Sequence, residues 1–115
     1  MKIATWNCNG AFRRKLAAAD SLDADVLVIQ ECENPALSTD AYQQWAGEYA
    51  WRGSNKNRGI GIFPRRGHRI TPLAWPDNGL RHFLPVRIDD AFDLVGVWTQ
   101  RDIAGSFSYI GQFWQ

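Results

Sequence analysis

Hydrophobic and polar positions along the first third of the chain predict a strand, a helix and a second strand. Residues 2–7 and 26–30 are short apolar runs, typical of buried strands. Residues 11–22 between them repeat apolar side chains at helical spacing, which predicts one helix. A right-handed helical crossover then makes the two strands parallel neighbours, with their carboxyl ends at one edge of the sheet.

The pattern changes in the rest of the chain. Ser38 or Thr39 is suited to cap a second short helix, which Gly47 ends. Five short runs with strand character follow, separated by turns rich in Gly, Pro, Asn and Asp. These runs are residues 49–53, 59–63, 68–75, 82–88 and 92–99. Their short connections predict antiparallel pairing. Residues 106–115 begin like a capped amphipathic helix.

Together these patterns predict an α/β (α+β) fold, with a mixed, largely antiparallel β-sheet and helices on one face. The length of 115 residues suits a single domain with one core, and a hydrophobic content of 45% excludes a disordered chain. Six tryptophans predict a sizeable apolar core, an apolar interface or both. The tryptophans predicted to lie in the core are Trp45, Trp51, Trp75 and Trp98.

Charge and cysteine content exclude few classes of protein function. The net charge of +1 does not indicate a strongly basic nucleic-acid-binding domain. Basic residues nevertheless cluster within 52–58, where they are either solvated charges or contacts to a phosphate backbone. Cys8 and Cys32 follow no zinc or redox spacing, so we expect reduced thiols. No signal peptide or long apolar segment is evident, so we expect a cytoplasmic protein without membrane contact.

Candidate chemistry lies where the first two predicted strands end. Asn7 and Glu31 each follow an apolar run, so both are expected at the sheet edge where α/β folds bind ligands. A carboxylate flanked by the amides of Asn7 and Asn9 suits a hard cation and a phosphate. Other interpretations stay open: Asn7 also suits the cap of the following helix, Asn9-Gly10 is a turn signal, and Glu31 also suits a solvated loop.

Two segments resemble a known family. Thr5-Trp6-Asn7-x-Asn9-Gly10, followed by Ala24-Asp25-Val26-Leu27-Val28-Ile29-Gln30-Glu31, is similar to the start of the endonuclease/exonuclease/phosphatase (DNase I-like) superfamily. Residues 59–63 and 94–99 resemble two later strands of that family. The resemblance spans essentially all of this chain but only the N-terminal half of the family domain. It implies half of a four-layer αββα sandwich, a single part-domain over residues 1–115 that ends before the family domain does.

The resemblance also implies a function. Family members hydrolyse phosphoesters with a divalent metal, so the chain is expected to be a Mg²⁺- (or Mn²⁺-) dependent phosphoesterase, a nuclease rather than a small-molecule phosphatase. By resemblance, Glu31 and Asn7 are metal-binding and catalytic residues, and Tyr109 is a catalytic residue that contacts phosphate. Asn9 lies near the metal and is a candidate substrate contact. The basic segment adds further candidate substrate contacts, which are Arg52, Lys56 and Arg58.

This chain departs from the family in one respect. The Gly-Asp-x-Asn and Ser-Asp-His segments of the family's second half are absent, and neither His68 nor His82 matches the catalytic histidine. The alternative is therefore a catalytically inactive half-domain that serves as a binding or assembly module. The expected partners are nucleic acid or a phosphorylated small molecule. We also expect one sheet face to be bare, and a homo-oligomer or a missing C-terminal half to cover it.

Overall fold

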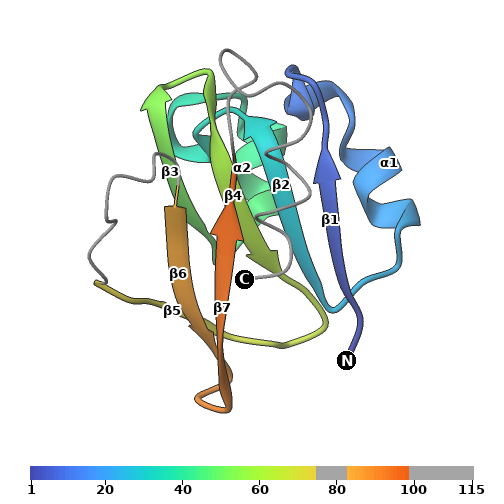
Figure 1. Cartoon of the computed structure of the whole chain (residues 1–115). Helices are drawn as coiled ribbons and strands as arrows, with labels where there is room; N and C mark the ends of the chain where they lie inside the picture. The colour runs from blue at the N-terminus through green and yellow to red at the C-terminus, as the bar shows by residue number, and fades with distance from the viewer. Residues whose placement is uncertain (75–82, 99–115) are drawn as a thin grey trace.

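Two β-sheets and a layer of short helices make up the part of the chain that the computed structural model describes, residues 1–74 and 83–98 (Figure 1). The first sheet contains, in spatial order, β1 (Ile3–Asn7), β2 (Val26–Cys32), β4 (Arg58–Pro64) and β3 (Ala50–Asn55). The second sheet contains β5 (Ile70–Pro72), β6 (Phe83–Ile88) and β7 (Phe92–Val97). Strands β1 and β2 are parallel and the other described pairs are antiparallel, which confirms the predicted mixed α+β class.

The predicted single helix over residues 11–22 is wrong. A 3-10 turn at Phe12–Arg14 comes first, and α1 follows at Leu16–Ser21. Residues on both sides of the 3-10 turn leave the helical conformation: Ala11 before it has a left-handed φ of 52°, and Lys15 after it has a φ of −124°. The break lets the Phe12 ring enter the core, where it is completely buried.

The second helical segment resolves the choice between two capping residues. A 3-10 turn at Pro35–Leu37 leads into α2 (Asp40–Ala46). Thr39 is the N-cap, because its Oγ1 accepts a hydrogen bond from the backbone N–H of Tyr42 at 3.3 Å. Gly47 follows with a φ of 59°, so the helix ends where the sequence predicts.

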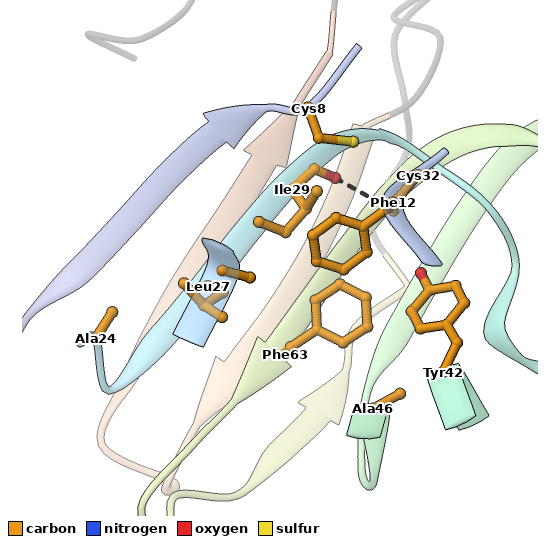
Figure 2. Packing of buried hydrophobic residues seen from close by; sticks show 10 residues of the cluster. Cys8, Phe12, Ala24, Leu27, Ile29, Cys32, Tyr42, Ala46 and Phe63 are labelled. Atoms are coloured by element: carbon orange, nitrogen blue, oxygen red, sulfur yellow. Dashed lines mark hydrogen bonds between the residues drawn. The ribbon is translucent and has the colours of Figure 1, made fainter. Parts of the chain in front are cut away.

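The helices pack on one face of the first sheet (Figures 1 and 2). Leu27 and Ile29 of β2 project toward them, and the rings of Phe12, Tyr42 and Phe63 fill the space between. Phe12 lies 5.6 Å from Tyr42 and 5.9 Å from Phe63, measured between ring centroids. The aromatic cluster fixes α2 against the sheet.

The opposite face of the first sheet packs on the second sheet. Val26 and Val28 of β2 point to this side, so β2 is buried on both faces, as its unbroken apolar run predicts. A second core forms between the sheets from the residues Val26, Val28, Ala50, Ile60, Ile62, Ile70, Leu84, Val86, Ile88 and Trp98. Trp98 is thus a core residue, whereas Trp45 and Trp51 are half-buried against the helical side and Trp75 lies outside the described residues.

The expectation of a bare sheet face is wrong for most of the first sheet. Strands β6 and β7 fold back over β3 and β4 and bury that face within the chain itself. Strand β1 differs, because Ile3, Thr5 and Asn7 remain exposed on it. Among residues 1–74 and 83–98, no helix is long and apolar enough to cross a membrane. The exposed side of β1 leads directly to the candidate site.

Candidate functional site

The candidate site lies where β2 bends at Glu31. The pairing of β2 with β4 runs through Gln30 opposite Ile60, then shifts so that Cys32 lies opposite Gly59. Glu31 is therefore a bulged residue, and its φ is 64°. A left-handed conformation of a residue other than glycine persists only where its surroundings hold it, and such residues gather at binding and catalytic sites.

The structure brings Asn7 and Glu31 together at this bulge. Parallel pairing places Asn7 beside Gln30, and its Nδ2 donates a hydrogen bond to Glu31 Oε2 at 2.8 Å. Asn7 Oδ1 accepts a hydrogen bond from the backbone N–H of Asn9 at 3.1 Å. The Asn7 side chain thus closes a local turn instead of capping the next helix, and it orients the Glu31 carboxylate.

The basic segment of the β3–β4 hairpin lies at the same sheet edge. Because β4 runs antiparallel to β2, the turn before β4 adjoins the end of β2. The Lys56 carbonyl accepts a hydrogen bond from the N–H of Asn34 at 2.8 Å, which ties this turn to the loop after β2. Lys56 and Arg58 are exposed there, beside the half-buried Glu31. Two exposed cations at this end of the sheet make the local potential more positive.

The remaining predicted site residues lie further away or outside the described part. Arg52 is exposed on β3, level with Gln30 across the sheet, and its Nη1 donates to the Phe83 carbonyl at 3.0 Å. That bond links the two sheets near the site edge. Tyr109 lies outside the described residues.

The donor set at Glu31 fits a cation that keeps most of its water. Among residues 1–74 and 83–98, no three His, Cys, Asp or Glu side chains gather closely enough to hold a metal ion. Mg²⁺ is commonly bound by one or two carboxylates together with waters and substrate phosphate. A single oriented carboxylate beside an amide, on an exposed sheet edge, meets that requirement.

Both cysteines lie under the site and are free. Burial raises the pKa of the Cys8 thiol to about 11, and burial also raises the pKa of Cys32. Both thiols are therefore protonated at neutral pH, so neither suits a soft-metal site or a nucleophile. Cys8 Sγ instead faces the carbonyls of Gln30 and Glu31, at 3.3 and 3.4 Å.

An ion pair between exposed Arg13 and buried Glu33 lies next to the site and could not be foreseen from the sequence. Glu33 is only 4% exposed, and its Oε2 lies 2.6 Å from Nη1 of Arg13. The backbone N–H of Arg13 points to the same oxygen at 3.5 Å. The pair ties the 3-10 turn at Phe12–Arg14 to the loop after β2. An acidic residue two positions after Glu31 was the only signal in the sequence, and it does not reveal burial.

His68 lies at the opposite end of the first sheet from Glu31. Its Nδ1 is 2.5 Å from Asp89 Oδ2, and its Nε2 is 3.3 Å from Asp25 Oδ1. The hydrogen bond to Asp89 is the main cause that raises the pKa of His68. Backbone N–H groups, from Lys2 to Asp25 and from Arg69 to Asp89, are the main cause that lowers the pKa of each carboxyl. His68 is therefore a bridge between surface turns, as its predicted surface position allows, and is no part of the site.

Comparison with known proteins shows that the fold of this chain is similar to that of a nuclease. No family model matches the chain, and no curated protein matches it. Among solved structures, a 3'-5' exonuclease from Neisseria meningitidis is similar over 97% of this chain and 48% of that chain, with a TM-score of 0.57 and 23% sequence identity. The chain thus spans about half the length of a nuclease whose fold it shares.

Proposed function

We propose that this chain carries the metal-binding part of a nuclease-type phosphoesterase site that hydrolyses phosphodiester bonds in nucleic acid. The contact between the Asn7 amide and the Glu31 carboxylate at the bulged end of β2 carries this proposal. Support also comes from the fold shared with a 3'-5' exonuclease and from the resemblance of both strand-end motifs to the endonuclease/exonuclease/phosphatase superfamily.

Each residue at this edge has a distinct part in the proposal. Glu31 holds Mg²⁺ or Mn²⁺, which when bound neutralises charge on the scissile phosphate. Asn7 keeps the Glu31 carboxylate in place and is a second candidate ligand, and Asn9 borders the same space. Lys56 and Arg58 contact the phosphate backbone from the hairpin. In the reaction, water attacks phosphorus, the bond to the leaving oxygen breaks, and the proton that the water loses ends on the leaving oxygen.

A second candidate function follows from the share of the neighbour that the chain covers. Because that share is 48%, the chain alone is also suited to be a half-domain that binds metal or nucleic acid without turnover. In that case groups outside residues 1–115 complete the site. The exposed side of β1, which carries Ile3, Thr5 and Asn7, borders the site and is open to such groups.

A DNA nicking assay distinguishes the phosphoesterase from the binding module without turnover. Purified full chain is incubated with plasmid or abasic DNA and Mg²⁺ or Mn²⁺, beside Glu31→Gln and a matched control, Asp93→Asn. Asp93 pairs with Arg87 on the second sheet at 2.8 Å, so its variant removes one carboxylate away from the site. Nicking by the wild type and Asp93→Asn, lost in Glu31→Gln, supports the enzyme. Equal nicking by all three refutes the site. Metal binding that depends on Glu31 without nicking supports the binding module.

A further inference from the structure

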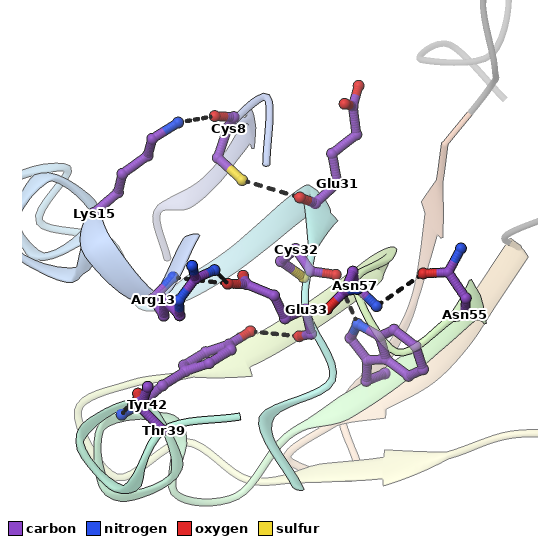
Figure 3. A network of polar contacts seen from close by, with 11 residues as sticks. Cys8, Arg13, Lys15, Glu31, Cys32, Glu33, Thr39, Tyr42, Asn55 and Asn57 are labelled. Atoms are coloured by element: carbon purple, nitrogen blue, oxygen red, sulfur yellow. Dashed lines mark hydrogen bonds and ion pairs between the residues drawn. The ribbon is translucent and has the colours of Figure 1, made fainter. Parts of the chain in front are cut away.

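The backbone around the Glu31 bulge is contacted by side chains from α2, from β3 and from the loop after β1. The pairing of β2 with β4 shifts at the bulge, and the carbonyls around the bulge are also contacted by side chains. These side chains come from different parts of the chain (Figure 3). Trp51 Nε1 donates to Cys32 O at 3.1 Å and Tyr42 Oη donates to Glu33 O at 2.8 Å, whereas the Cys8 thiol faces two carbonyls, Gln30 O at 3.3 Å and Glu31 O at 3.4 Å.

The packing fixes the directions of these donors. Tyr42 is fully buried, and its ring meets Phe12 edge-on at a centroid distance of 5.6 Å. The Trp51 indole lies against Gly53 and Gly59, where an added Cβ would come within 2.6 and 2.5 Å of the indole ring. These glycines therefore provide the room in which the indole reaches β2. Cys8 is 2% exposed, and its own carbonyl accepts a hydrogen bond from Lys15 Nζ at 2.5 Å.

We propose that Cys8, Trp51 and Tyr42 are positioning residues for Glu31. By contacting the carbonyls on both sides of the bulge, they keep the left-handed backbone of Glu31 in place and its carboxylate within reach of the Asn7 amide. The inference rests on the proposed function in one respect, which is that Glu31 binds the cation. Its geometric part, the placing of Glu31 against Asn7, is independent of any metal.

The test removes each donor with the smallest change in shape. Tyr42→Phe deletes only a hydroxyl, whereas Trp51→Phe removes the indole N–H together with part of the ring that packs on Gly53 and Gly59. Cys8→Ala deletes the thiol, and Cys8→Ser keeps a donor at that position. Ile88→Val, in the core between the sheets, is the control for a general loss of stability. For every variant of the full chain, Mn²⁺ affinity is measured by water proton relaxation, thermal unfolding by circular dichroism, and the Asn7 side-chain amide by NMR without metal.

We expect Tyr42→Phe and Trp51→Phe to bind Mn²⁺ about 10-fold more weakly, the low end of the range for partners that orient metal ligands. Cys8→Ala is expected to weaken binding and Cys8→Ser to restore it. The Asn7 amide signal is expected to move in each weakened variant and to stay unchanged in Ile88→Val. Folded Tyr42→Phe and Trp51→Phe variants with wild-type affinity and an unmoved Asn7 signal would overturn the inference. Weakening by Ile88→Val to the same extent would also overturn it.

Failure of the proposed function gives a different result. If Glu31→Gln binds Mn²⁺ as the wild type does, Glu31 is not the ligand, and the proposed function is wrong. The Asn7 amide signal then still decides whether the three donors position Glu31. Should Tyr42→Phe fail to fold, Trp51→Phe and the pair of Cys8 variants carry the same test.

Discussion

A methyl group added at Gly59 is expected to disturb both the β3–β4 hairpin and the site edge. An added Cβ would lie 2.5 Å from the Arg52 carbonyl oxygen and 2.5 Å from the Trp51 ring. Ordinary contacts of a Cβ begin near 3.4 Å, so each neighbour has to move by about 0.9 Å. The carbonyl belongs to the paired strand, and the indole is held by its bond to Cys32. Neither moves without loss of a native interaction.

The magnitude for Gly59→Ala follows from those two neighbours. Overpacking in a dense region costs about 1–3 kcal/mol of unfolding free energy. Loss of the Trp51 hydrogen bond adds about 1 kcal/mol, because a buried carbonyl is left unpaired. We therefore expect a loss of about 2–4 kcal/mol, a large part of the roughly 5–15 kcal/mol that keeps a domain folded.

Gly96→Ala is the matched control, because it makes the same change within another strand. Its Cβ would lie 2.9 Å from Cδ1 of Ile60 and 3.3 Å from Cδ1 of Ile62, the ends of two side chains that can turn aside. The expected loss is about 1 kcal/mol, the low end of overpacking. The measurement is urea unfolding followed by tryptophan fluorescence, with m-values compared between variants. Equal losses for the two variants, or a larger loss for Gly96→Ala, would refute the reasoning.

Two other perturbations test the charged parts of the surface. The pKa of His68 is raised in the folded chain. The contribution of His68 to stability is therefore complete below the ordinary pKa of 6.5, and it is lost as the pH rises through the raised pKa. The difference in urea midpoint between wild type and His68→Gln should therefore shrink as the pH rises above 6.5 and passes through the raised pKa. A difference that stays constant with pH contradicts the bridge. At the site edge, Lys56→Ala with Arg58→Ala should lower the salt slope of single-stranded DNA binding by about 1.4, roughly 0.7 per contact. The control is Arg69→Ala, which lies at the end of the first sheet near His68 and should leave the salt slope unchanged. The slope is measured by fluorescence anisotropy at several salt concentrations. An unaltered slope in the double variant rules out contacts from Lys56 and Arg58 to the DNA backbone.

The start of the fold and the meeting of Asn7 with Glu31 could be predicted from the sequence. The apolar run of β2 is continuous, which is typical of a strand covered on both faces. The crossover rule then determines at which edge the two strand ends meet. Because only handedness and strand order were needed, the contact between Asn7 and Glu31 followed without any knowledge of the other side chains.

The layer arrangement could not be predicted in the same way. Alternation of apolar residues shows that a strand has a buried face, but not which sheet buries it. Strands β5, β6 and β7 therefore looked like further members of one sheet, although they pair among themselves and cover β3 and β4. The break between the 3-10 turn and α1 was hidden for a related reason, because Ala11 and Lys15 are residues with ordinary helical preferences.

The bulge at Glu31 had no signal in the sequence, and its position is informative for that reason. Other left-handed residues, such as Asp23, Arg66 and Asp89, lie in turns, where their conformation follows from chain reversal. Among the described residues, Glu31 is the one residue other than glycine that adopts this conformation within a strand. A strand interior gives no local reason for such a backbone, so the cause lies in the side chains that hold it. The Glu31 carboxylate also accepts the hydrogen bond from Asn7. The chain therefore spends backbone energy at the residue whose carboxylate it orients as the candidate metal ligand.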